Sequence, residues 1–168
     1  MKKQSFPFLE KICLEHGGEK RKHKRKIARP ISTKDALHVV IRSTRAKNQW
    51  SLLHPRHVKR IKELIKEASD RFQIRIYQFA IVGNHIHLLI RGKMRLYIQN
   101  FLKFLPGSIA MIVTGAKKGN KVGRFWNYLA YSRVVSFNKG FKIVSSYILK
   151  NEKEGKFIER LMATEDSS

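Results

Sequence analysis

Near the middle of the chain stands the sequence QIRIYQFAIVGNHIHLLIR, residues 73–91. Residues 73–82 alternate between apolar and other side chains, which is the period of a strand. Gly83 and Asn84 follow, two residue types that favour a tight hairpin turn, and residues 85–91 supply the returning strand. The sequence therefore predicts an antiparallel pair of strands.

The segments around this pair predict further strands and helices. Residues 36–44 are rich in β-branched side chains, which favours a strand. Over residues 55–72, apolar side chains recur at helical spacing after Pro55, a residue that suits the first turn of a helix. The order βαββαβα predicts an α+β fold with a central antiparallel β-sheet and helices packed on it. On the C-terminal side we expect a helix over residues 94–105 that Pro106 and Gly107 interrupt, a helical piece over 108–113, a strand over 125–136 and a helix over 140–153.

The charge of the chain is strongly one-sided. Its 168 residues include 36 Lys and Arg against 12 Asp and Glu, a formal net charge of +24, which favours an anionic polymer as partner. From Arg71 to Asn151 the chain has no Asp or Glu. This excludes carboxylate-pair catalysis and an all-carboxylate two-metal nuclease site from that span. A surface without carboxylates suits nucleic-acid phosphates.

The two ends of the chain differ from its centre. Residues 1–30 are predicted to form a basic, flexible arm, because the run from Lys20 to Arg29 contains seven Lys and Arg residues and no periodic apolar face. A merely solubilising tail and a localisation signal are the competing interpretations. Residues 156–168 are expected to form a short C-terminal tail, which leaves residues 31–155 as the folded domain.

Cysteine content and apolar runs bear on the compartment. Cys13 is the only cysteine, so neither an intrachain disulfide nor a cysteine zinc cluster can form within the chain. No apolar run approaches the ~20 residues of a transmembrane span, and the apolar stretch near the start of the chain is too short for a signal peptide. We therefore expect a cytoplasmic protein with no membrane partner.

Two polar pairs are candidates for chemistry. His85 and His87 are two residues apart on a predicted strand, so both point to the same face, where neutral imidazoles can bind a divalent cation. Taken alone, two of seven histidines can fall at this spacing by accident. Tyr147 and Asn151 are four residues apart and share one helical face. On its own, this second pair is better explained by a core aromatic and a polar residue near a helix end.

Taken together, these segments resemble the HUH single-tyrosine transposases, a family that includes the insertion-sequence-200-like enzymes and the REP-associated tyrosine transposases. The resemblance covers residues 31–155, and its strongest match is NHIHLLI, which begins at Asn84. Three further segments match: HVVIR from His38, GRFW from Gly123 and YILKN from Tyr147. The resemblance implies a ferredoxin- or RRM-like HUH nuclease fold, with residues 31–155 as the catalytic domain.

The resemblance also implies a role for each candidate residue. His85, His87 and Asn151 match the family's ligands for Mg²⁺ or Mn²⁺, and Tyr147 matches its nucleophile. The implied activity is that of a metal-dependent single-stranded DNA endonuclease and strand transferase, which acts at DNA hairpins in transposition through a 5′-phosphotyrosine intermediate. A tyrosine hydroxyl has an ordinary pKa of about 10, so a neighbouring charge has to assist it at neutral pH. The implied location is the prokaryotic cytoplasm, at the nucleoid.

Basic and aromatic side chains complete the predicted site. Trp126, Tyr128 and Tyr131 are candidates either for packing or for stacking on bases. A catalytically silent DNA- or RNA-binding protein on the same scaffold and a ribosome- or RNA-associated basic protein are the alternatives, because charge and aromatic residues serve them equally. Both a monomer and a homodimer are compatible with the sequence. The residues predicted to bind DNA are Lys20, Arg21, Lys22, Lys24, Arg25, Lys26, Arg42, Arg91, Lys117, Lys118, Lys121, Arg124 and Lys150.

Overall fold

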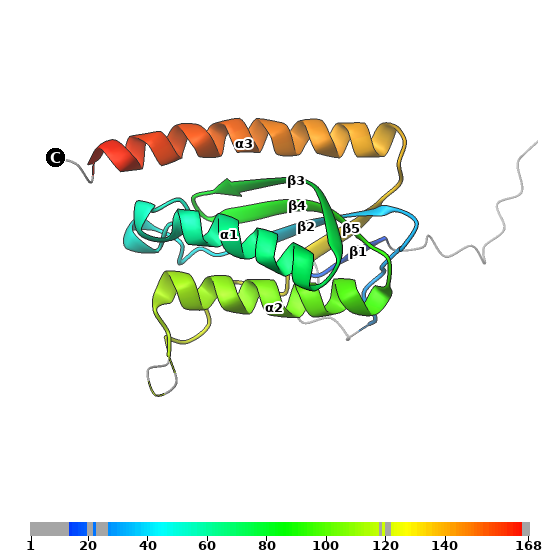
Figure 1. The fold of residues 1–168 in the computed structure, drawn as a ribbon, viewed down its shortest axis with the longest axis horizontal. Coiled ribbons are helices and arrows are strands. Elements are labelled where there is room, and N and C mark those ends of the chain that lie inside the picture. Colours follow the sequence, from blue (N-terminus) through cyan, green and yellow to red (C-terminus); the bar gives the residue numbers. More distant parts are fainter. Residues whose placement is uncertain (1–13, 20–21, 23–26, 118, 120–121, 166–168) are drawn as a thin grey trace, which may run out of the picture.

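The computed structural model describes residues 14–19, 22, 27–117, 119 and 122–165. Its strands form one antiparallel sheet in the order β1-β5-β2-β4-β3. Helix α3 lies along one face of this sheet, and α1 and α2 lie together on the opposite face (Figure 1). The predicted α+β class with a central antiparallel sheet is therefore confirmed. The elements are β1 (Glu15–His16), β2 (Ala36–Arg42), a short 3₁₀ helix (Asn48–Trp50), α1 (Pro55–Arg71), β3 (Ile74–Val82), β4 (His85–Gly92), α2 (Arg95–Thr114), β5 (Tyr131–Val135) and α3 (Lys139–Glu165).

The predicted hairpin is the centre of the sheet. β3 and β4 pair from Val82 opposite His85 to Ile74 opposite Gly92, as the turn residues indicate. β4 also pairs with β2, so both of its edges are hydrogen-bonded. One set of alternate β4 side chains enters the main core under α1 and α2, while the other set faces α3. The strand is thus held rigidly, which fixes the side chains that it carries.

The two faces of the sheet are buried in different ways. The main core combines apolar side chains of α1 and α2 with the sheet, and Ile86, Leu88 and Ile90 of β4 are fully buried in it. On the other face, Leu89 packs with Ile148 of α3 in a smaller cluster. The smaller cluster positions α3 over β3 and β4, which is the contact that brings helix and strand residues together.

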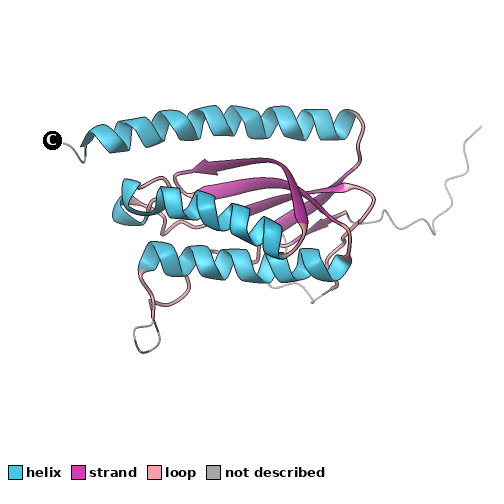
Figure 2. Cartoon of the chain, viewed as in Figure 1, coloured by secondary structure: helices cyan, strands magenta, loops and turns pink. Residues whose placement is uncertain are grey.

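The prediction that Pro106 interrupts a helix is wrong. α2 continues through Pro106 as one helix (Figure 2). A proline inside a helix costs about 3 kcal/mol or more, because it removes one backbone hydrogen bond and crowds the preceding turn. Here Phe101, Leu105 and Ile109 on either side of it are fully buried in the core, and their packing offsets that cost. Tertiary packing therefore overrides the local signal.

The continuous helix has a consequence for the membrane prediction. By length and composition alone, α2 is long and apolar enough to cross a membrane. The local sequence predicts no apolar run of this length, because Pro106 is expected to divide the helix. Core helices of globular domains pass the same test. The buried side of α2, which includes Phe101 and Leu105, packs on α1 and the sheet.

The strand predicted over residues 125–136 is shorter than expected, because only Tyr131–Val135 pairs in the sheet. Ahead of it, the Asn127 backbone N–H donates to the Arg42 carbonyl oxygen at 3.1 Å. The Asn127 side-chain oxygen accepts from the backbone N–H of Thr44 at 2.9 Å. These bonds replace a regular ladder, so the chain crosses the end of β2 as an irregular segment.

Both predicted ends contain regular structure. Within the range predicted as an arm, Glu15 and His16 form the edge strand β1, which pairs with β5. At the other end α3 continues to Glu165, through the range predicted as a tail. Its last turns are supported by an ion pair between Lys62 of α1 and Glu159 at 2.8 Å. Most of the basic run predicted in the arm lies outside the described residues.

Candidate active site

The two histidines of β4 share one face of the sheet. His85 stands at the first position of the strand and His87 two residues later, so both side chains point toward α3. Their ring centroids are 4.7 Å apart and their planes are nearly perpendicular. The neighbouring position, Ile86, is fully buried on the opposite face. The alternation predicted from sequence is therefore what brings the two imidazoles together.

Tyr147 and Asn151 of α3 meet these histidines. The Tyr147 ring stands perpendicular to the His87 ring, with 5.3 Å between their centroids, and half of the Tyr147 side chain is exposed. Asn151 is buried one turn further along, and its side-chain N–H donates to the Tyr147 carbonyl oxygen at 2.8 Å. The structure thus gathers all four residues that sequence comparison singled out, from two elements of the same chain.

A cavity of about 700 Å³ opens over this cluster. His85, His87 and Tyr147 line it, together with Arg42 at the end of β2. It is large enough for part of a nucleotide chain, and its charged wall carries an arginine next to the histidines. The other lining residues are Gly17, Gly18, Glu19, His38, Val40, Thr44, Asn127, Tyr128, Leu129 and Tyr131.

His38 is a site residue to which sequence reasoning assigned no role. It lies on β2, which pairs with β4, and its Nε2 is 3.2 Å from Nδ1 of His87. The two rings are nearly parallel, with 5.5 Å between their centroids. The register between β2 and β4 creates this contact, and a register cannot be read from either strand alone.

Burial keeps these imidazoles neutral at pH 7. Loss of solvation lowers the pKa of His87 to about 3, and the neighbouring His85 and His38 rings add to this effect. Burial likewise lowers the pKa of His38 to about 4, with a smaller contribution from Arg133. Neutral imidazole is the form that binds a metal ion.

Neighbouring groups shift the pKa of His85 in opposite directions. Burial is the main cause that lowers its pKa, and the positive charge of Arg42 lowers it further. The Asn151 side chain and the Glu154 carboxylate both act in the opposite direction. Glu154 lies three residues after Asn151, where the carboxylate-free span ends, and is a second site neighbour that sequence reasoning missed. Its position about one helical turn beyond Asn151 could have indicated that the two residues share a face of the helix.

The donor atoms fit a divalent cation. Nε2 of His87 is buried and has no hydrogen-bond partner among the described residues. Nδ1 of His85 is 2.6 Å from the Asn84 side-chain oxygen, which can only accept, so His85 keeps a lone pair on its other nitrogen. Within the described ranges, no three His, Cys, Asp or Glu side chains come together as a metal site. The Asn151 amide, which lies beside His85, is the further donor that the sequence prediction names.

Comparison with known proteins identifies the family of this chain. A sequence profile described as "Transposase IS200 like" matches residues 32–151. The chain belongs to the IS200-like transposase family. No curated protein sequence matches it. The resemblance to the IS200-like transposases that the sequence motifs indicated is thereby confirmed, and with it the class of protein.

Two solved structures are similar to this chain. A REP-associated tyrosine transposase bound to a REP hairpin is similar with a TM-score of 0.52 and 10% identity, over 74% of this chain and 70% of that chain. A candidate transposase from Deinococcus radiodurans matches with a TM-score of 0.46 and 16% identity, over 76% of this chain and 98% of that chain. The first likeness identifies the HUH transposase fold.

The basic residues of this IS200-like transposase are spread over several surfaces. Arg42 lines the cavity, and Lys150 is exposed on α3 one turn beyond Tyr147. Arg124 lines a second depression of about 580 Å³, which shares Tyr128 and Leu129 with the first. Exposed Lys22, Arg91 and Lys117 do not line either depression. Lys20, Arg21, Lys24, Arg25, Lys26, Lys118 and Lys121 lie outside the described residues.

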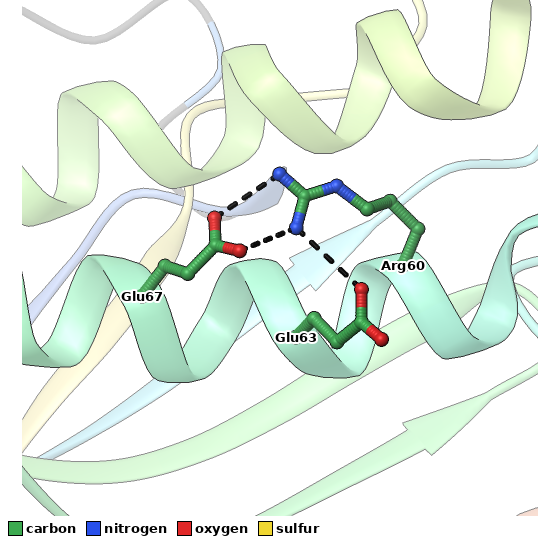
Figure 3. A network of polar contacts seen from close by, with 3 residues as sticks. All are labelled: Arg60, Glu63 and Glu67. Atoms are coloured by element: carbon green, nitrogen blue, oxygen red, sulfur yellow. Dashed lines mark hydrogen bonds and ion pairs between the residues drawn. The ribbon is translucent and has the colours of Figure 1, made fainter.

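Some arginines of the transposase are engaged within the protein. Arg91 donates to the Thr33 carbonyl oxygen and lies over the Phe137 ring. Arg60 on α1 donates two hydrogen bonds to Glu67 and forms an ion pair with Glu63 at 3.7 Å (Figure 3). An arginine with two carboxylate partners is a weaker phosphate ligand than one facing an open cavity. Arg42, by contrast, faces the open cavity.

Proposed function

We propose that this transposase is a metal-dependent endonuclease and strand transferase of single-stranded DNA, with Tyr147 as nucleophile and a 5′-phosphotyrosine intermediate. One observation carries the proposal. Tyr147 is half exposed in the same cavity as His85 and His87, next to an unpartnered His87 nitrogen. A nucleophile, a metal-binding pair and a phosphate-sized space are thus present together.

The proposed reaction is an in-line substitution at phosphorus. The Tyr147 oxygen forms a bond to the scissile phosphorus and loses its proton, while the bond from phosphorus to the 3′ oxygen of the preceding nucleotide breaks. That oxygen takes up a proton and leaves as a 3′-hydroxyl, and the other strand end stays on Tyr147 through its 5′-phosphate. The number of phosphoester bonds is unchanged, so strand joining needs no ATP.

The remaining groups assist this step. When bound, Mg²⁺ or Mn²⁺ supplies Lewis-acid polarisation of the phosphoryl oxygens, and His85, His87 and Asn151 are the residues that would hold it. Arg42 at the cavity wall would add positive charge beside the scissile phosphate. Asn151 also fixes the backbone of the turn that carries Tyr147, through its bond to the Tyr147 carbonyl oxygen. Asn151 therefore links the proposed metal site to the proposed nucleophile.

The proposed substrate is a DNA hairpin with a single-stranded flank. The similar REP-associated transposase is described as bound to a REP hairpin, and a net charge of +24 suits a phosphate polymer. Because Tyr147 lies beside histidines of its own chain, a monomer already contains the whole site, and a homodimer is not required for cleavage. The proposed location is the cytoplasm, at the nucleoid, where the substrate resides.

A covalent-trapping experiment tests the proposed function. The protein is incubated with hairpin DNA and Mn²⁺, and the products are separated on a denaturing gel. We expect a covalent protein–DNA band that is lost in Tyr147→Phe and retained in the matched control Tyr97→Phe, which removes a hydroxyl from α2. DNA binding without any covalent band across a hairpin library would instead favour the catalytically silent binding protein.

A further inference from the structure

His38 and His87 form a buried pair of imidazoles across two neighbouring strands. The register of β2 and β4 places Val40 opposite His87, so His38 lies two residues further along on the same face. Their side chains are only 8% and 3% exposed, and a ring nitrogen of each faces the other at 3.2 Å. Both residues are therefore buried, although they also line the cavity.

The contact permits two arrangements of protons. If His38 Nε2 carries the proton, His87 has to carry its own on Nε2, where no described residue accepts it. A buried N–H without an acceptor is costly. If His87 Nδ1 carries the proton and donates to His38, Nε2 of His87 holds a lone pair instead. The second arrangement strands no donor at His87, and it puts the proton of His38 on Nδ1, which is not among the buried side-chain atoms without a partner in the described residues.

We propose that His38 is a positioning residue, which accepts a hydrogen bond from Nδ1 of His87 and so holds Nε2 of His87 ready to bind the metal ion. This inference rests on the proposed function, because it takes His87 to be a metal ligand. Metal-binding histidines commonly donate their second nitrogen to a carboxylate, a backbone carbonyl or water. Here the neutral imidazole of His38 takes that place, at 3.2 Å from Nδ1 of His87.

The role of His38 can be tested on the full chain without DNA. His38→Phe keeps a ring of similar volume but has no acceptor, whereas the side-chain oxygen of His38→Gln reaches the position of the lost nitrogen. Mn²⁺ affinity is measured by electron paramagnetic resonance of the unbound ion. We expect His38→Phe to weaken Mn²⁺ binding by ~10–100-fold, the range for outer partners of metal ligands. His38→Gln should restore binding to within a few-fold of the wild type.

A second measurement needs no variant. Nitrogen-15 NMR of the imidazole groups in the metal-free wild type reports which nitrogen of His87 carries the proton, and we expect Nδ1. A proton on Nε2 would overturn the role of His38, as would equal Mn²⁺ affinity in the wild type and a folded His38→Phe. In both cases the metal site itself stands if the wild type binds Mn²⁺. A wild type that binds no Mn²⁺ would overturn the proposed function together with this inference.

Discussion

The Tyr147 ring stands perpendicular to the His87 ring at 5.3 Å, although the two residues belong to different elements 60 positions apart. β4 is fixed by strands on both sides, whereas α3 is held mainly by packing, with Ile148 against Leu89 as its buried anchor, and by side-chain contacts such as the Lys62–Glu159 ion pair. The approach of α3 to the sheet therefore sets the distance between the proposed nucleophile and the proposed metal ligands. Changes in this packing should alter both stability and chemistry.

Gly155→Ala should disturb this approach. A β-carbon at Gly155 would lie 2.1 Å from the Ile81 carbonyl oxygen, so α3 would have to move away from β3. We expect the free energy of unfolding in urea to fall by about 1–3 kcal/mol, the cost of overpacking a tight contact, and the rate of covalent trapping to fall with it. Gly107→Ala is the matched control, because a β-carbon at Gly107 would meet no heavy atom of a packed neighbour within 4 Å. Alanine also favours a helix over glycine by up to about 1 kcal/mol. Equal stability of the two variants would show that α3 is not held at this point.

Arg42 should contribute to the salt dependence of DNA binding. If six or more phosphates are contacted, affinity should fall by about 10³-fold or more between roughly 50 and 200 mM salt. Arg42→Gln should reduce the slope of log affinity against log salt by about one. Arg60→Gln, which removes an arginine already bound to Glu67 and Glu63, should leave the slope unchanged. Equal changes of the slope in the two variants would mean that DNA binding depends only on the net charge.

The proposed metal ligands should be needed for trapping but not for folding. Chelation with EDTA should abolish the covalent band, and Mn²⁺ should restore it in the wild type. His87→Ala should lower the trapping rate by at least ~100-fold, more than the loss of an outer partner causes. The control is His54→Asn, which removes a histidine at the start of α1 while keeping a residue that can cap that helix. Trapping by the wild type in EDTA would contradict metal dependence.

The free energy of unfolding should decrease in acid, and His57 should carry part of this loss. Burial lowers the pKa of His57, despite its hydrogen bond to the Ser51 carbonyl oxygen, so the unfolded chain binds more protons below about pH 6.5. Stability is therefore highest above that pH and falls as the pH drops toward the folded-state pKa. His57→Gln, whose side chain can still donate to Ser51, should reduce the steepness of this decrease in urea titrations between pH 7 and 5. An unchanged slope would show that His57 does not contribute.

Much of the fold follows from local pattern. The hairpin of β3 and β4 has both alternation and turn residues, and α1 has apolar spacing with Pro55 at its start, so these elements match their predicted limits within a residue or two. α2 differs because buried packing overrides Pro106. The segment before β5 differs because Asn127 bonds to β2 instead of extending the ladder.

The candidate site residues that belong to a sequence motif were predicted. Those that join the site only through contacts between separate elements were missed. His85 and His87 follow from strand alternation, and Tyr147 and Asn151 from helical spacing together with the family resemblance. His38 depends on the register of β2 against β4, and Glu154 on where α3 crosses β4. Neither relation is encoded in a short stretch of sequence.

Peptide mapping of the covalent product tests whether Tyr147 attacks phosphorus and retains the 5′-phosphate. Hairpin DNA labelled at its 3′ end is trapped with Mn²⁺, and the product is digested with trypsin and analysed by mass spectrometry. Cleavage after Lys142 and Lys150 gives peptide 143–150 with Tyr147 as its only tyrosine, whereas Tyr128 and Tyr131 share peptide 125–133. We expect the 3′-labelled DNA on peptide 143–150. Label on peptide 125–133, or a covalent product that retains only 5′-labelled DNA, would contradict it.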